Sequence, residues 1–259
     1  MKNERVIIIG GGVGPQAGTL LHNYIIENTL TNGTDQDHLD IYHFSRSSDI
    51  PDRTDSLKNG TSENPARGMY NTFQIAASAI LTANRSAVGG IPCNTFHAPE
   101  IFNKFKKMTE GIKSEIKILN MIEETVQTVL HNYPDVKKIG IMSTTGTRKT
   151  RIYTDQLQKN SLEVIQVPEK IQPKLHDSIY NQEWGIKGIT PVSSRAKINF
   201  EEFSDYLIDN GAEIIILGCT EIPLALPYKQ YKDIPLIDPM VSLARALIRE
   251  ANVIKLKQV

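Results

Sequence analysis

The stretch IIIGGGVGPQAG, residues 7–18, is a short apolar run that ends in a glycine-rich turn. A continuous run of β-branched residues is typical of a parallel strand that is covered on both faces. The turn predicts that a helix begins near Pro15, because proline suits the first turn of a helix. Residues 12–17 also fit the G-x-G-x-x-G/A pattern of a dinucleotide-binding turn. The stretch therefore predicts an α/β fold and raises the question of which ligand, if any, the turn serves.

The rest of the chain repeats this alternation of strands and helices. Strands that alternate with helices of ordinary length predict βαβ units and parallel sheets. The predicted strands are residues 5–11, 40–45, 86–93, 115–120, 137–143, 162–167, 212–219 and 234–238. The predicted helices are residues 15–30, 67–84, 121–132, 149–160, 198–210 and 240–251.

A weak internal repeat divides the chain into similar halves. VIIIGGGVG is echoed by IGIMSTTGT, GGIPCNTFHAP by IILGCTEIP, and KILNMIEETV by PLIDPMVSLA. The repeat predicts two similar open parallel-sheet α/β domains related by pseudo-symmetry. We expect residues 1–120 to form the N-terminal domain, completed by the C-terminal segment 228–259, and residues 121–227 to form the second. Ligands of open α/β sheets bind beyond the carboxyl ends of strands, so we expect an active site in the cleft between the domains.

Composition and charge exclude several classes of function. The chain has 29 Lys plus Arg and 29 Asp plus Glu among 259 residues, so no bulk charge favours nucleic acid or an anionic membrane. Its first apolar run is too short for a signal peptide, and no segment approaches membrane-spanning length. Only Cys93 and Cys219 are cysteines. We therefore expect a cytoplasmic protein with reduced thiols and without a nucleic-acid or membrane partner.

Each cysteine follows a predicted strand and precedes small polar residues. Asn94 and Thr95 follow Cys93, and Thr220 follows Cys219. A thiol at a helix N-terminus is expected to have a lowered pKa, and the backbone N–H groups there bind carboxylates. A single cysteine after an apolar strand is more often an inert buried side chain. The matched placement in both halves favours a paired role, with one thiol as base and the other as acid on opposite faces of a substrate carbon.

These motifs resemble the cofactor-independent aspartate/glutamate racemase superfamily. PCNT at 92–95 together with GCTE at 218–221 resembles its paired cysteine signature. GGVGP (11–15), IPDRT (50–54), MIEET (121–125) and PLIDPM (235–240) resemble its aspartate racemase branch. The resemblance covers residues from about 5 to 250. It implies two α/β domains, a small amino-acid substrate, no cofactor and a homodimer.

The resemblance also implies roles for particular residues. Cys93 and Cys219 would be the proton-transferring pair, with their sulfur atoms roughly 7 to 8 Å apart if each approaches one carbon. Arg53 would hold the distal carboxylate of the substrate, supplemented by Lys187; the simpler alternative for both is a surface ion pair. The remaining expected substrate contacts are Val13, Asn94, Thr95, Thr144 and Thr220.

Several residues depart from the usual pattern of the family. Phe96 follows PCNT where a smaller residue is usual and could narrow the pocket. Arg46 is an additional arginine that could favour another acidic amino acid or pair with Asp49, Asp52 or Asp55. Gln16 and Gly18 replace commoner residues in the opening turn. His97 could orient Asn94 or its loop, and Trp184 could close the pocket or pack in a core.

The dinucleotide interpretation is the weaker one for the opening turn. The second predicted strand ends in Ser45, Arg46 and Ser47, not in the acidic residue that holds a ribose, although Arg46 could accept a 2′-phosphate. Pro15 removes a backbone N–H where a pyrophosphate needs donors. We expect instead a tight turn that lets the backbone approach a small substrate closely.

The favoured function is racemisation of an acidic amino acid by two cysteines. The alternatives are a broad-specificity racemase, a hydantoin racemase, a maleate-type isomerase, and a two-lobed amino-acid-binding protein without catalytic activity. Arg53 together with Lys187 favours a dicarboxylic substrate over hydantoin. Two cysteines at strand ends have no purpose in a protein that only binds.

Overall fold

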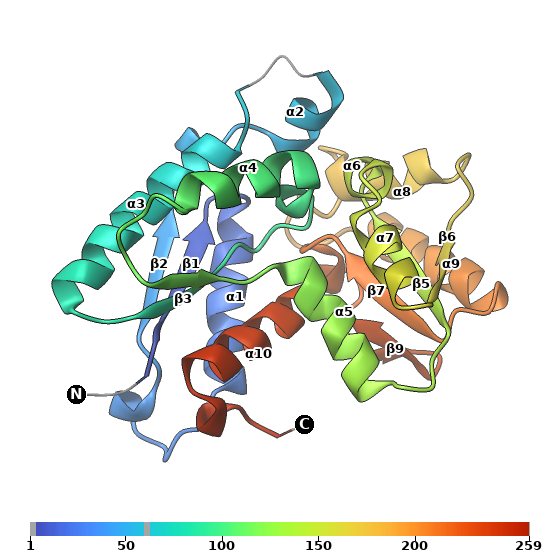
Figure 1. The fold of residues 1–259 in the computed structure, drawn as a ribbon. Helices are drawn as coiled ribbons and strands as arrows, with labels where there is room; N and C mark the ends of the chain where they lie inside the picture. The colour runs from blue at the N-terminus through green and yellow to red at the C-terminus, as the bar shows by residue number, and fades with distance from the viewer. Residues whose placement is uncertain (1–3, 60–62, 259) are drawn as a thin grey trace. The chain divides into compact units, whose positions relative to one another are not determined.

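The computed structural model describes residues 4–59 and 63–258. The chain divides into two compact units, one formed by residues up to Glu124 together with those from Met240 onward, and the other by Thr125–Pro239. Each unit is built around one sheet with helices packed against it (Figure 1). Among the described residues, no helix is both long and apolar enough to cross a lipid bilayer.

The first unit contains a four-stranded parallel sheet in the order β2-β1-β3-β4. Its strands are β1 (Val6–Gly11), β2 (Ile41–Ser45), β3 (Ala87–Gly90) and β4 (Ile116–Ile118). Its helices are α1 (Pro15–Asn28), α2 (Arg53–Asn59), α3 (Ala66–Ala83), α4 (Pro99–Thr109) and α10 (Pro239–Ala251). The boundary between the units falls inside α5 (Met121–Asn132).

The central strand β1 is buried on both faces, as its continuous apolar run predicts. Val6 and Ile8 belong to the apolar cluster that includes residues of α3 and α4. Ile7 and Ile9 point the other way, into the cluster formed with α1 and α10. This alternation is the period of two that a strand imposes on its side chains, and it fixes which helices cover which face of the sheet.

The second unit contains a five-stranded sheet in the order β6-β5-β7-β9-β8. Only the short strand β8 runs antiparallel to its neighbour. The strands are β5 (Lys138–Ser143), β6 (Glu163–Gln166), β7 (Ile214–Gly218), β8 (Gln230–Tyr231) and β9 (Ile234–Ile237). The helices are α6 (Thr145–Lys149), α7 (Ile152–Lys159), α8 (Gln172–Tyr180) and α9 (Ser194–Asp209).

The two sheets repeat one topology, which confirms the predicted fold class. The order β2-β1-β3-β4 corresponds to β6-β5-β7-β9, and the echoed sequence segments fall on corresponding strands. One predicted boundary is wrong. Residues 228–239 were expected in the first domain, but β9 pairs with β7 and so completes the second sheet, as β4 completes the first. The chain returns to the first unit only at α10.

Candidate active site

The glycine turn after β1 packs closely against the backbone of the segment that follows β2. Gly12 has a φ of +88°, and a Cβ on it would lie 2.7 Å from the backbone nitrogen of Arg46. Glycine is needed here for both reasons. The close neighbour of Gly12 is thus the protein's own backbone at Arg46 and Ser47, whereas the approach of this turn to a substrate stays a prediction. Arg46 itself forms an ion pair with Asp49, one of the partners that the sequence offered.

Arg53 joins the glycine turn to the segment that follows β2. Its Nη2 donates a hydrogen bond to the Val13 carbonyl oxygen at 2.8 Å, and its Nη1 donates to the Pro51 carbonyl at 3.4 Å. The Val13 side chain is buried in the same apolar cluster as Cys93. The structure thus brings Val13, Arg53 and Cys93 together at the carboxyl end of the first sheet.

Cys93 lies just beyond β3, in a loop that a buried histidine fixes in place. Cys93 is 8% exposed, and the neighbouring Asn94 and Thr95 are also buried. His97 Nδ1 lies 2.8 Å from the Cys93 carbonyl oxygen, and its Nε2 accepts a hydrogen bond from the Met121 N–H at 3.3 Å. Because Nε2 accepts, Nδ1 carries the hydrogen and donates it to the carbonyl. Burial lowers the pKa of His97 to about 4, so the ring is neutral at physiological pH.

Phe96 does not narrow a pocket. Its side chain is fully buried and packs edge-on against Phe105, with ring centroids 5.5 Å apart. The large residue after PCNT is therefore a core residue of the first unit, anchored beneath the cysteine loop. A smaller residue at this position would leave a cavity between the loop and α4.

In the second unit, the turn after β5 occupies the place that corresponds to the glycine turn. Thr144 caps α6, and its Oγ1 accepts a hydrogen bond from the Thr147 N–H at 3.2 Å. The Thr145 N–H donates to His176 Nδ1 at 3.3 Å. Since β5 pairs with β7 in parallel, Thr144 and Cys219 leave the same end of neighbouring strands.

A buried carboxylate links the residues predicted around Cys219. The Cys219 Sγ donates to Glu221 Oε2 at 3.1 Å, and Thr220 Oγ1 donates to the same oxygen at 2.8 Å. The Lys187 Nζ lies 3.3 Å from Glu221 Oε1 and 4.8 Å from the centre of the Tyr180 ring. Glu221 was visible in the GCTE motif, but the sequence assigned it no role; it is the residue that brings Cys219, Thr220 and Lys187 together.

The electrostatics of Cys219 contradict one expectation. A lowered pKa was expected for a thiol at a helix start, but burial and the Glu221 carboxylate raise the pKa of Cys219, with Lys187 acting in the opposite direction. The following helical turn, η4 (Ile222–Leu224), is too short to supply a sizeable dipole. In this arrangement Cys219 is a thiol at neutral pH, suited to donate a proton.

Lys187 forms an ion pair that is partly buried, since its own side chain is 25% exposed. The partner Glu221 has a side chain that is only 11% exposed, and its carboxylate also contacts Cys219. Trp184, on the same loop, is half-buried and stacks against Arg195, whose guanidinium carbon is 3.9 Å from the ring centre. Its carbonyl accepts a hydrogen bond from Ser193 Oγ at 2.6 Å. Trp184 therefore braces the loop that carries Lys187.

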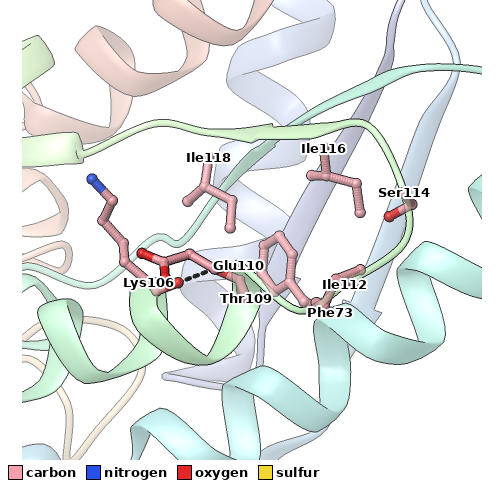
Figure 2. Close-up of a pocket in the computed structure, with 8 residues that line it drawn as sticks. All are labelled: Phe73, Lys106, Thr109, Glu110, Ile112, Ser114, Ile116 and Ile118. Carbon is pink, nitrogen blue, oxygen red and sulfur yellow. Dashed lines mark hydrogen bonds between the residues drawn. The ribbon is translucent and has the colours of Figure 1, made fainter.

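A hollow elsewhere in the first unit does not compete with the strand ends as a candidate site. Figure 2 shows it between α3, α4 and the edge strand β4, with a volume of about 240 Å³. Its floor includes Phe73, Ile116 and Ile118, and Lys106 and Glu110 stand at its side. None of the residues predicted to carry chemistry lines this hollow.

A sequence profile of the Asp/Glu/hydantoin racemase family matches residues 11–247, almost the whole chain. The chain belongs to this family. It is an isomerase of the racemase type, and the resemblance seen in the sequence is confirmed.

Individual proteins are similar to the chain in sequence or in fold. An uncharacterized protein from the pnlA 3′ region of Pectobacterium carotovorum is 33% identical over 126 residues, which are 48% of this chain and 75% of that protein. The aspartate racemase of Picrophilus torridus superimposes with a TM-score of 0.75 at 25% identity, over 95% of this chain and 94% of its own. An aspartate racemase homologue from Pyrococcus horikoshii shares the fold, with a TM-score of 0.66 at 20% identity over 96% and 99% of the two chains.

Proposed function

We propose that this family member racemises an acidic amino acid of the aspartate or glutamate type, without a cofactor, using Cys93 and Cys219 on opposite faces of the α-carbon. In one direction the Cys93 thiolate takes the α-proton, and the electron pair of the broken C–H bond moves into the carboxylate as an enolate-like anion. The Cys219 thiol then delivers its proton to the other face. The reverse reaction exchanges the two roles.

The observation that carries the proposal is the repeated placement of a thiol at corresponding sheet positions. Cys93 follows β3 and Cys219 follows β7, the matching strand of the second sheet. Each is nearly buried but keeps some exposure, 8% and 5%. Cys219 also has a hydrogen-bonded, protonated sulfur, as the acid of such a pair requires.

The surrounding residues suit a dicarboxylic substrate. Arg53 and Lys187 supply one cation in each unit, which favours an acidic amino acid over hydantoin or a neutral amino acid. We assign Asn94, Thr95, Thr144 and Thr220, together with the Val13 backbone, to the α-carboxylate and amino group. We further propose that the protein acts in the cytoplasm as a homodimer, in line with its two reduced thiols and with the family resemblance.

The proposal is tested by following the α-proton. Purified protein is incubated with each enantiomer of aspartate and glutamate in heavy water, and loss of the α-proton signal and change of optical rotation are recorded. We expect both. Cys93→Ala and Cys219→Ala should each reduce racemisation at least about 100-fold, because each removes one of the two proton carriers.

Thermal unfolding of both variants serves as the folding control. Folded variants that retain wild-type racemisation would contradict the two-cysteine mechanism. Binding of aspartate without any exchange in the wild-type protein would instead support an amino-acid-binding protein. Exchange of hydantoins alone would support the hydantoin racemase alternative.

A further inference from the structure

Both oxygens of the Glu221 carboxylate are engaged within the second unit. Oε2 accepts hydrogen bonds from the Cys219 sulfur at 3.1 Å and from Thr220 Oγ1 at 2.8 Å, while Oε1 faces the Lys187 ammonium at 3.3 Å. An ionised carboxylate only accepts hydrogen bonds, so the hydrogen between Cys219 and Glu221 belongs to the sulfur. The bond exists only while the thiol is protonated.

We propose that Glu221 is a positioning residue that keeps the proton on Cys219, and that Lys187 limits how strongly it does so. The catalytic meaning of this role rests on the proposed function, although the protonation of Cys219 can be measured without catalysis. If Cys219 rests as the thiol, the resting enzyme uses it as the acid and Cys93 as the base. The enantiomer whose α-proton faces Cys93 is then the one that the resting enzyme accepts directly.

The charges near Cys219 explain why Lys187 is needed. Once Cys219 has given its proton to the substrate, a thiolate lies beside the Glu221 carboxylate, and two negative charges at this distance repel each other strongly out of water. The Lys187 ammonium on the far oxygen offsets this repulsion. Glu221 and Lys187 together therefore keep Cys219 protonated at rest and still allow it to release the proton during turnover.

The other groups that act on Cys219 leave this balance intact. Tyr153 approaches from α7, and burial raises its pKa well above the ordinary value, so that it stays neutral over the working range of pH. Asp238, which follows β9, acts on Tyr153 in the same direction. The charged groups that act on the Cys219 thiol are thus Glu221 from the loop after β7 and Lys187 from the loop between α8 and α9, while Tyr153 on α7 stays neutral.

The test measures the pH dependence of alkylation at each cysteine in the full-length protein. Samples are treated with iodoacetamide between pH 7 and pH 10.5, and the Cys219 peptide is quantified by mass spectrometry. Glu221→Gln should move the Cys219 profile to lower pH, with at least about a tenfold faster reaction at pH 8, because only the thiolate reacts. Lys187→Gln should move it to higher pH and slow the reaction by a similar factor. The shape of the profile reports protonation, since limited access to the sulfur scales all rates together.

Matched controls are Glu213→Gln, at the other end of β7, and Lys174→Gln, which pairs with Glu202 on the surface. Both should leave the Cys219 profile unchanged. Unchanged profiles in folded Glu221→Gln and Lys187→Gln, or shifts in the same direction, would overturn the proposal; if Glu221→Gln does not fold, the direction of the Lys187→Gln shift decides. The shifts of the alkylation profile are expected whether or not the protein racemises any amino acid. The alkylation experiment and the heavy-water experiment therefore test the two proposals independently.

Discussion

At the scale of single residues, one departure from the family pattern has a packing cause. A Cβ on Gly18 would lie 2.4 Å from His43 Nε2, and a Cβ on Gly11 would lie 2.7 Å from the same atom. His43 projects from β2 into the space that these two glycines leave open. Its pKa is lowered by burial and by the neighbouring His22, so a neutral ring fills this space. Gly18 therefore accommodates a histidine, and its presence carries no information about the substrate.

This packing predicts that the effect of Gly18→Ala on the free energy of unfolding changes sign when His43 is removed. Gly18→Ala should lower the free energy of unfolding by about 1–3 kcal/mol, because the methyl group meets the imidazole. In a His43→Ala background the same change should stabilise by up to about 1 kcal/mol, since alanine favours a helix over glycine. Urea unfolding of the four proteins measures the cycle. Equal effects in both backgrounds would show that His43 is not the obstacle.

At this scale the sequence indicates candidate residues for the site, but it does not show which side chains contact one another. Short motifs and the family resemblance led to the prediction that the two cysteines, Arg53 and Lys187 belong to the site. The carboxylate that holds Cys219 was not, because its effect depends on Lys187, which a separate loop brings to it. For the same reason the direction of the Cys219 pKa shift was mispredicted: a motif shows the neighbouring helix start but not the burial of the sulfur or the oxygen in contact with it.

At the scale of elements, the apolar strands could be predicted and the short helices could not. All eight predicted strands are present, and the two-residue β8 was not predicted. The central strands β1 and β7 are buried throughout, and such strands are continuous runs of apolar residues. Three helices, α2, α4 and α8, lie outside the predicted helix ranges, and the stretch 149–160 proved to be the end of α6 and the separate α7. Short helices have few apolar positions and are stabilised by tertiary contacts. Because α8 was not predicted, two of its contacts could not be anticipated: His176 accepts a hydrogen bond from Thr145, and Tyr180 packs against Lys187.

The connection between η3 (Thr95–His97) and α5 predicts a pH dependence of stability. His97 bridges the Cys93 carbonyl and the N-terminus of α5 only as a neutral ring, and its folded pKa of about 4 is below the ordinary value of 6.5. The unfolded state therefore binds the proton more readily, and the stability due to this difference is complete above pH 6.5. It is lost as the pH falls toward 4, by up to about 3 kcal/mol.

Comparison of wild type with His97→Gln isolates this contribution from that of the carboxylates. The variant should be less stable at pH 7, and the difference in unfolding free energy should shrink by up to about 3 kcal/mol as the pH is lowered to 4. Phe105→Leu is the control: it weakens the apolar cluster that contains Cys93 and Phe96 but removes no titrating group, so its curve should stay parallel to that of the wild type. A parallel curve for His97→Gln would refute the role of the neutral imidazole.

At the scale of the whole molecule, the first unit is discontinuous in the sequence. Its second apolar cluster joins Ile7 and Ile9 of β1 to α1 and to Met240, Leu243 and Leu247 of α10. The chain ends are tied together as well, since the Arg5 N–H donates to the Ala251 carbonyl at 3.2 Å. Figure 1 shows the blue and red parts of the chain within this one unit, whereas the second unit is a single continuous segment.

This arrangement predicts unequal effects of truncation. Removal of residues 240–259 should unfold the first unit, because the sheet face that α1 and α10 cover together loses α10, while residues 125–239 retain their own sheet and core. Limited proteolysis with mass spectrometry should then recover a protected fragment close to residues 125–239. The full-length chain is the reference and should resist cleavage in both units. Equal protection of both units in the truncated chain would contradict the prediction.

The position of α10 in the sequence also affects how the protein folds during translation. Because α10 follows residues 125–239 in the chain, the ribosome must translate that whole segment before α10 can pack against Ile7 and Ile9. The second unit, residues 125–239, can fold while translation continues. Nascent chains should therefore keep part of an apolar sheet face exposed until α10 has left the ribosome, and chaperones that hold unfolded chains should bind them at that stage.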